Sequence, residues 1–165
     1  MIILPEQVTQ AIGVLEKAGY DADVVGECVR ELLLGNNPQD YDIVTNAGIN
    51  DILFAFREYR ISDEGMKRGE VLVTVVGMII QVSPYRREVV GNRVMYAEDL
   101  ETDLFRRGFT MNAMAYSPRT GLIDPFGGRA SLRPDPAEIA DEEREELQEG
   151  LFLIRRTTSN AVPAW

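Results

Sequence analysis

One short stretch near the start of the chain constrains its fold more than any other, because it predicts a strand, a helix and a second strand in close succession. Residues 22–26 form an apolar run that ends in glycine, which is typical of a buried strand. Residues 28–34 carry apolar side chains at helical spacing, and the glycine that follows them favours a helix that ends there. Residues 41–45 are rich in β-formers and predict the next strand.

Two aspartates stand where this second strand is expected to begin. Side chains two residues apart on a strand point to the same side, so Asp40 and Asp42 should lie side by side, with Tyr41 and Ile43 directed into the core. Adjacent carboxylates repel each other unless a cation lies between them, and hard oxygen ligands suit magnesium or manganese. An isolated D-x-D is also typical of a solvated turn, and it is the context that favours a metal site here.

That context includes a candidate phosphate site. Gly26 ends the first strand and opens the helix, where backbone N–H groups and the helix dipole favour an anion. Arg30, one turn further on, is suited to a bidentate contact with phosphate. The sequence therefore predicts phosphate-binding groups and metal-binding carboxylates on neighbouring elements.

The rest of the chain predicts an α+β fold with a mixed sheet flanked by helices, because strands and helices mix without strict alternation. Residues 86–96 are polar and are expected to form a mobile connection. The expected helices cover residues 5–18, 49–56, 100–107 and 135–149, and the further strands cover residues 71–76, 78–82, 113–117, 122–123 and 151–154.

Composition narrows the possible functions. The 165 residues are enough for one compact domain, and the absence of histidine excludes His-based triads and zinc sites of the H-E-x-x-H kind. Cys28 is the single cysteine and no apolar run is long enough to span a bilayer, so we expect a cytoplasmic protein without a membrane segment. The net charge of −10 is concentrated in residues 135–149, while basic residues recur in pairs that allow local basic patches.

Three motifs, in order along residues 18–128, resemble the head domain of the bacterial class II CCA-adding enzyme and poly(A) polymerase family, within the DNA polymerase β-like nucleotidyltransferases. The family pattern G-G-x-V-R-D-x-L-L-G followed by D-x-D appears here as GECVRELLLG and then DYD. The segment DEGMKRGEVLVTVV is similar to the loop and strand that follow. The segment DLFRRGFTMNAMAYSPRTGLIDPFGG is similar to the motif D-L-x-x-R-D-F-T-x-N-A-M-A-Y and the hairpin after it.

The resemblance implies transfer of a nucleoside monophosphate from a nucleoside triphosphate to an RNA 3′ hydroxyl, usually that of tRNA, with two Mg²⁺ or Mn²⁺ ions. It implies a nucleotidyltransferase head domain over residues 1–132. We expect the acidic helix, short strand and tail of residues 133–165 to pack on or extend the same domain. By the resemblance, Asp40 and Asp42 are the catalytic metal ligands. The implied nucleotide-binding residues are Gly26 and Arg30 for the triphosphate, and Arg107, Thr110 and Asn112 around the sugar.

The sequence departs from the family pattern where the pattern carries function. Glu27 replaces the second glycine, and its charge opposes phosphate. Glu31 replaces an aspartate, Gly108 replaces the aspartate of R-D-F-T, and Gln81 stands where the family commonly has an acid. These changes leave open a second hypothesis, a catalytically degenerate domain that binds a nucleotide or a protein partner. A neck and body that bind RNA would have to be supplied elsewhere.

Overall fold

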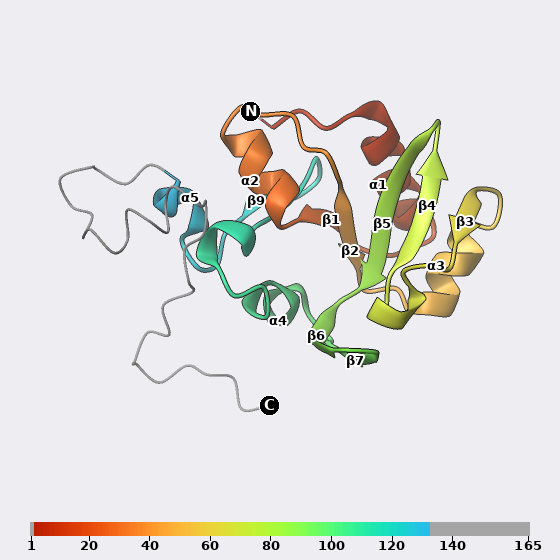
Figure 1. Cartoon of the computed structure of the whole chain (residues 1–165). Coiled ribbons are helices and arrows are strands. Elements are labelled where there is room, and N and C mark those ends of the chain that lie inside the picture. The colour runs from red at the N-terminus through yellow and green to blue at the C-terminus, as the bar shows by residue number, and fades with distance from the viewer. Residues whose placement is uncertain (1, 133–165) are drawn as a thin grey trace.

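The computed structural model describes residues 2–132, so the expected acidic helix at 135–149 and strand at 151–154 lie outside the described residues. Within residues 2–132 a seven-stranded sheet is flanked by helices (Figure 1). In the order in which they lie, its strands are β3 (Arg60–Ser62), β4 (Val71–Val75), β5 (Met78–Pro84), β2 (Asp42–Thr45), β1 (Ala22–Val25), β8 (Ala115–Ser117) and β9 (Gly121–Ile123).

The sheet is mixed, because β2 and β5 pair in parallel while its other neighbouring strands are antiparallel. This arrangement confirms the predicted α+β class. The helices are α1 (Glu6–Lys17), α2 (Glu27–Leu33), α3 (Ile49–Ala55), α4 (Leu100–Phe105) and α5 (Gly128–Ser131), with 3-10 turns η1 (Met66–Arg68) and η2 (Thr110–Asn112). No helix among these residues is both long and apolar enough to cross a bilayer.

The two faces of the sheet bury different clusters. The larger cluster packs α1, α2 and α3 against alternate residues of the strands, as in β4, where Val71, Val73 and Val75 are fully buried. The smaller cluster lies on the other face and joins the sheet to α4 and η2. Its members are Val25, Val44, Tyr85, Leu104, Ala113 and Ala115. Alternation along the strands thus directs one set of side chains to the main core and the other set toward α4.

Residues 86–96 were predicted from their polarity to be a mobile connection, without strand structure. They instead form a hairpin of β6 (Arg86–Val90) and β7 (Arg93–Tyr96), which turns at Gly91 with a positive φ of 57°. The two strands make a separate two-stranded sheet whose outer residues are exposed, so polar side chains are compatible with strand structure here. The composition of this segment reflects its exposed position.

The hairpin predicted near Gly77 is confirmed. β4 and β5 pair up to Val75 and Met78 and turn through Val76 and Gly77, whose φ angles are 45° and 79°. Two positive φ angles are the requirement of a type I′ turn, whose twist matches that of the flanking strands. The hairpin between β8 and β9 is also confirmed.

Candidate functional site

Three segments that are far apart in the sequence meet at one end of the sheet. Val25, the last residue of β1, pairs with Asp42 of β2 on one side and with Ala115 of β8 on the other. Gly26 at the start of α2, the aspartate pair and the segment that precedes β8 therefore come together. The strand register alone is enough to bring the three sequence motifs into one region.

The aspartate pair lines a hollow of about 400 Å³ beside α2. Asp42 begins β2 and is half-buried, whereas Asp40 is exposed and precedes the strand, so the expectation that both lie on the strand is wrong. The chain reaches β2 from the turn after α2, and regular pairing starts only at Asp42. Both carboxylates nevertheless line the same hollow, while Tyr41 and Ile43 are buried as predicted.

Residues with side-chain oxygen atoms line the hollow from more than one strand. Gln81 of β5 pairs with Asp42 and lines the hollow with the two aspartates. Within residues 2–132 no group of three or more His, Cys, Asp or Glu side chains is placed to hold a metal ion. Magnesium is commonly bound through one or two carboxylates together with water and substrate phosphates. Asp40 and Asp42 are two carboxylates of the kind that could supply part of the ligand set of a hard divalent cation.

Beside the aspartates, four of the predicted site residues contact one another. Gly26 has a φ of 79° and a ψ of −137°, and a Cβ atom there would lie 3.0 Å from Nη1 of Arg107. Arg30 donates from Nη1 to Oδ1 of Asn112 at 2.8 Å. Only glycine combines that backbone conformation with so close an approach. The structure thus brings together Gly26, Arg30, Arg107 and Asn112.

Two glutamates also engage Arg30. Glu27 accepts from Nη2 at 2.8 Å and Glu31 accepts from Nε at 3.1 Å. The Arg30 side chain is 12% exposed and that of Glu27 is 74% exposed. Since both glutamates line the hollow with Asp40 and Asp42, their carboxylates add negative charge next to the arginine that was predicted to bind phosphate.

Asp103 of α4 binds Arg107, the second arginine of the predicted nucleotide site. Its carboxylate is completely buried, and Oδ1 accepts from Nε and Nη2 of Arg107 at 3.0 and 2.8 Å. Oδ2 accepts from the backbone N–H of Arg86 at 2.7 Å and lies 3.7 Å from Nε of Arg106. The guanidinium groups of Arg106 and Arg107 and the backbone N–H of Arg86 thus surround one buried carboxylate.

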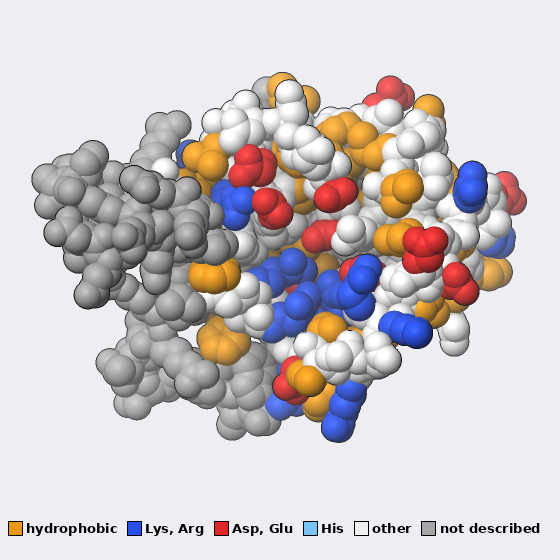
Figure 2. Space-filling model, in the orientation of Figure 1, with side chains coloured by type: hydrophobic (Ala, Val, Ile, Leu, Met, Phe, Trp, Pro, Cys, Tyr) orange, Lys and Arg blue, Asp and Glu red, His pale blue; other side chains and the backbone are white. Residues whose placement is uncertain are grey.

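A second buried carboxylate extends this network along the sheet. Glu70, just before β4, accepts from Nε and Nη2 of Arg68 at 2.9 and 2.7 Å and pairs with Nη1 of Arg86 at 3.4 Å. Figure 2 shows basic side chains gathered on one face, in the region between α4 and β5, with acidic side chains beside them. Opposite charges therefore adjoin on this face of the molecule.

These charges act on Asp42. Burial raises the pKa of the Asp42 carboxyl above its usual range, and the positive charge of Arg107 opposes that shift most strongly. Glu70 and Asp40 raise the pKa further, while Arg86 lowers it. A cation bound beside Asp42 would favour its ionised form in the same way as the arginines do.

Thr110 and Gly108 lie in the same motif but do not join the contacting group. The Thr110 hydroxyl contacts the hydroxyl of Ser131 in α5 at 3.1 Å, which links η2 to that helix. Gly108, at the position of the family's aspartate, has a φ of 83°, and a Cβ atom added there would meet open space. Among the described residues, no other side chain fills the space next to Gly108.

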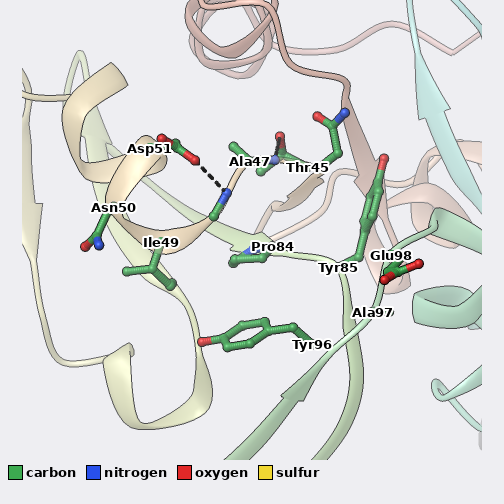
Figure 3. Close-up of a pocket in the computed structure, with 12 residues that line it drawn as sticks. Thr45, Ala47, Ile49, Asn50, Asp51, Pro84, Tyr85, Tyr96, Ala97 and Glu98 are labelled. Carbon is green, nitrogen blue, oxygen red and sulfur yellow. Dashed lines mark hydrogen bonds between the residues drawn. The ribbon is translucent and has the colours of Figure 1, made fainter.

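A second cavity, of about 840 Å³, lies at the opposite end of β2 (Figure 3). The Tyr96 ring faces Ile49 and Pro84 across it. Two of its polar side chains make local hydrogen bonds. Asp51 accepts from the N–H of Gly48 at the start of α3, and Thr45 accepts from the N–H of Ala47. The carboxylate pair does not line this cavity, and we place the candidate site at Asp40 and Asp42.

Sequence reasoning missed Asp103, Glu70 and Arg86 as parts of the site. A local signal existed for Asp103, which precedes Arg107 by four residues in a segment predicted to be helical. No local signal existed for the pair of Glu70 and Arg86, because they meet only through the β4–β5 hairpin.

Comparison with known proteins places the mixed sheet and its flanking helices in the class of nucleotidyltransferase folds. The structure of the Bacillus stearothermophilus CCA-adding enzyme in complex with CTP superimposes with a TM-score of 0.70 and 39% identity, covering 78% of this chain and 32% of that one. A tRNA nucleotidyltransferase complexed with a primer tRNA and an incoming ATP analog matches with a TM-score of 0.58 and 27% identity, covering 73% and 36%.

The sequence comparisons define the family. The model of the poly A polymerase head domain matches residues 22–135, and the chain belongs to this family. The CCA-adding enzyme of Geobacillus stearothermophilus is 35% identical over 159 residues, which cover 89% of this chain and 38% of that enzyme. The chain thus spans about two fifths of the length of this relative, and the predicted resemblance is confirmed.

Proposed function

We propose that this chain is the nucleotide-binding and catalytic part of a tRNA nucleotidyltransferase. It would transfer a nucleoside monophosphate from a nucleoside triphosphate to an RNA 3′ hydroxyl and release pyrophosphate. One observation carries the proposal: Asp40 and Asp42 line one hollow beside the contacting group of Gly26, Arg30 and Arg107. The names of the CCA-adding relatives and the complexes of similar structures with CTP and with tRNA support it.

Each residue has a proposed role. Asp40 and Asp42 hold Mg²⁺ or Mn²⁺, and Gly26 and Arg30 contact the triphosphate. The sugar side of the nucleotide is contacted by Arg107, Thr110 and Asn112. Two such ions, held by Asp40 and Asp42, would supply activation of an attacking hydroxyl and stabilisation of the leaving pyrophosphate.

The acceptor requires more than residues 2–132 provide. We propose that the RNA 3′ end, that of tRNA, is held by neck and body domains outside this region, since the similar structures that bind these substrates are about three times as long as the matched part. A cytoplasmic location is proposed because the chain has a single cysteine, Cys28, and therefore no intrachain disulfide.

A second candidate function is a degenerate nucleotidyltransferase-like domain that binds a nucleotide or a protein partner without transfer. The contacts of Arg30 favour it, because Glu27 and Glu31 already engage the guanidinium that would hold phosphate. Gln81 and Gly108 favour it as well, since each lacks the charge of the acid found in the family pattern.

The deciding experiment is a titration of each nucleoside triphosphate with Mg²⁺ by calorimetry, together with pyrophosphate release in the presence of tRNA that lacks its 3′ CCA. The parent chain is compared with the variant that combines Asp40→Ala and Asp42→Ala. The matched control combines Asp63→Ala and Glu64→Ala, which removes two exposed carboxylates away from the hollow. We expect pyrophosphate release to fall by about a hundredfold or more in the first variant and to be unchanged in the control.

The two candidates give different results. Mg²⁺-dependent binding with pyrophosphate release that requires both aspartates supports the enzyme. Nucleotide binding that requires neither Mg²⁺ nor the two aspartates supports the binding module, whereas absence of release alone does not, because the acceptor is proposed to be held by domains outside residues 2–132. Binding and release that are both independent of Asp40 and Asp42 exclude the proposed metal site.

A further inference from the structure

Asp103 is a buried carboxylate that the proposed function does not yet use. Its side chain has no exposed surface, and an ionised carboxylate is costly to bury unless it is paired and hydrogen-bonded. Both of its oxygens are engaged, one by the guanidinium of Arg107 and the other by the backbone N–H of Arg86. Such complete pairing fixes the groups that surround it.

Arg107 needs such a tether, because α4 ends before it. The last residue of α4 is Phe105, and Gly108 follows Arg107 with a left-handed φ of 83°. The helix therefore does not hold the Arg107 side chain, which has many rotamers when it is unrestrained. Asp103 binds Nε and Nη2, and this orients the third nitrogen, Nη1, toward Gly26.

We propose that Asp103 is a positioning residue of the nucleotide site, which holds the Arg107 guanidinium over Gly26 in the orientation that meets the nucleotide. The inference rests on the proposed function. Its physical basis is that a guanidinium already fixed by a buried partner loses little conformational freedom when a ligand binds. Asp103 itself stays beneath Arg107 and does not touch the nucleotide.

The test uses Asp103→Asn, which keeps the shape of the side chain and removes its charge. The dissociation constant of a nucleoside triphosphate with Mg²⁺ is measured by calorimetry on the full chain. The orientation of Arg107 is followed by the ¹⁵N NMR signal of its Nε–H, assigned through its loss in Arg107→Lys. We expect affinity to fall about tenfold or more, and the Nε–H signal to shift and to exchange faster with solvent.

A matched control separates positioning from support of the helix. Asp99→Ala removes the N-cap of the same helix, where Asp99 Oδ1 accepts from the N–H of Thr102 at 2.7 Å. It should lower thermal stability without changing nucleotide affinity. If Asp103 acts through Arg107, the double variant Asp103→Asn with Arg107→Lys should bind no more weakly than Arg107→Lys alone.

The outcomes distinguish this inference from the proposed function. A parent chain that binds no nucleoside triphosphate overturns both. A parent that binds, together with unchanged affinity and an unchanged Nε–H signal in Asp103→Asn, overturns only the role of Asp103. Equal weakening by Asp99→Ala also overturns it. Should Asp103→Asn fail to fold, Asp103→Glu keeps the buried charge, displaces the carboxylate by one methylene group, and is expected to weaken binding in the same way.

Discussion

Asp42 at the start of β2 lies directly opposite Gln81 of β5, in the parallel register that joins these two strands. Both residues line the hollow that also contains Asp40. The amide of Gln81 therefore occupies the place where an acid would act together with the aspartate pair. The neutral amide offers an oxygen donor without the negative charge that attracts a divalent cation.

Replacing Gln81 by glutamate should strengthen metal binding. The added charge lies beside Asp42 with no change in side-chain length, so we expect Mn²⁺ affinity to rise about tenfold or more, as measured by electron paramagnetic resonance. Gln10→Glu on α1 is the control, because it adds the same charge at an exposed position. Gln10 Nε2 donates to the Tyr59 hydroxyl at 2.9 Å, and the carboxylate of the variant can accept from that hydroxyl instead. Equal affinity in Gln81→Glu and the parent would place the metal away from β5.

Glu27 should weaken triphosphate binding in the natural chain. Its carboxylate lies 2.8 Å from Arg30 Nη2 and competes with phosphate for the same donor. Glu27→Gln and Glu27→Gly should each tighten triphosphate binding, by about tenfold, and the gain should shrink at high salt. The measurement is calorimetry at two ionic strengths.

The control for Glu27 is Glu6→Gln. Glu6 is the first residue of α1, as Glu27 is of α2, so the substitution reproduces the loss of an acid from a first helical turn. It should leave triphosphate affinity unchanged. Unchanged affinity in both Glu27 variants as well would mean that Arg30 does not contact the triphosphate.

Much of the fold could be predicted because its signals are local. The apolar spacing of α1 and the glycine that ends β1 are properties of neighbouring residues, and the elements they predicted are confirmed. The strand boundary at Asp42 was missed by one residue, since pairing with β1 and β5 decides where β2 begins. The β6–β7 hairpin was missed because its strands are exposed and polar on a surface that the sequence pattern does not reveal.

The site was predictable only where a motif encodes it. Asp42 and Arg107 were predicted from motifs, and they act on each other across the site, because the charge of Arg107 lowers the pKa of Asp42. The pair of Glu70 and Arg86 depends on the register of β4 and β5, which no short segment specifies. In the sequence, Glu27 was likewise visible only as a departure from the family pattern. Nothing indicated that its carboxylate accepts from the Arg30 guanidinium.

Cys28 should resist alkylation in the folded protein. Its thiol is buried, Sγ donates to the carbonyl of Val25, and burial raises its pKa to about 11. At pH 8 about one thiol in a thousand would be ionised, and the thiolate is the reactive form. We expect iodoacetamide to modify the native protein at least about a hundredfold more slowly than the protein in guanidinium chloride. Glutathione serves as the control thiol in both solvents, and rapid stoichiometric modification of the native protein would contradict the burial of the Cys28 thiol.

Asp23 should contribute less to the stability of the folded state at neutral pH than at acidic pH. This carboxylate is 4% exposed, and burial raises its pKa above the usual value, although hydrogen bonds from Ser117 and Thr120 oppose the shift. Because the folded state then holds its proton at a pH where the unfolded chain has lost it, this group's contribution to stability falls as pH rises. The fall begins near the ordinary aspartate pKa of about 3.9 and is complete above the raised value.

Asp23→Asn removes that charge while its amide oxygen can still accept from the Thr120 hydroxyl, as Asp23 Oδ1 does at 3.1 Å. The free energy of unfolding should therefore be higher in the variant than in the parent at pH 7, and the difference should shrink toward pH 3. Urea denaturation followed by circular dichroism at both pH values measures it. A variant that is less stable at pH 7 than at pH 3, relative to the parent, would show that the attraction of Arg119 and the two hydroxyls outweighs the cost of burying the charge.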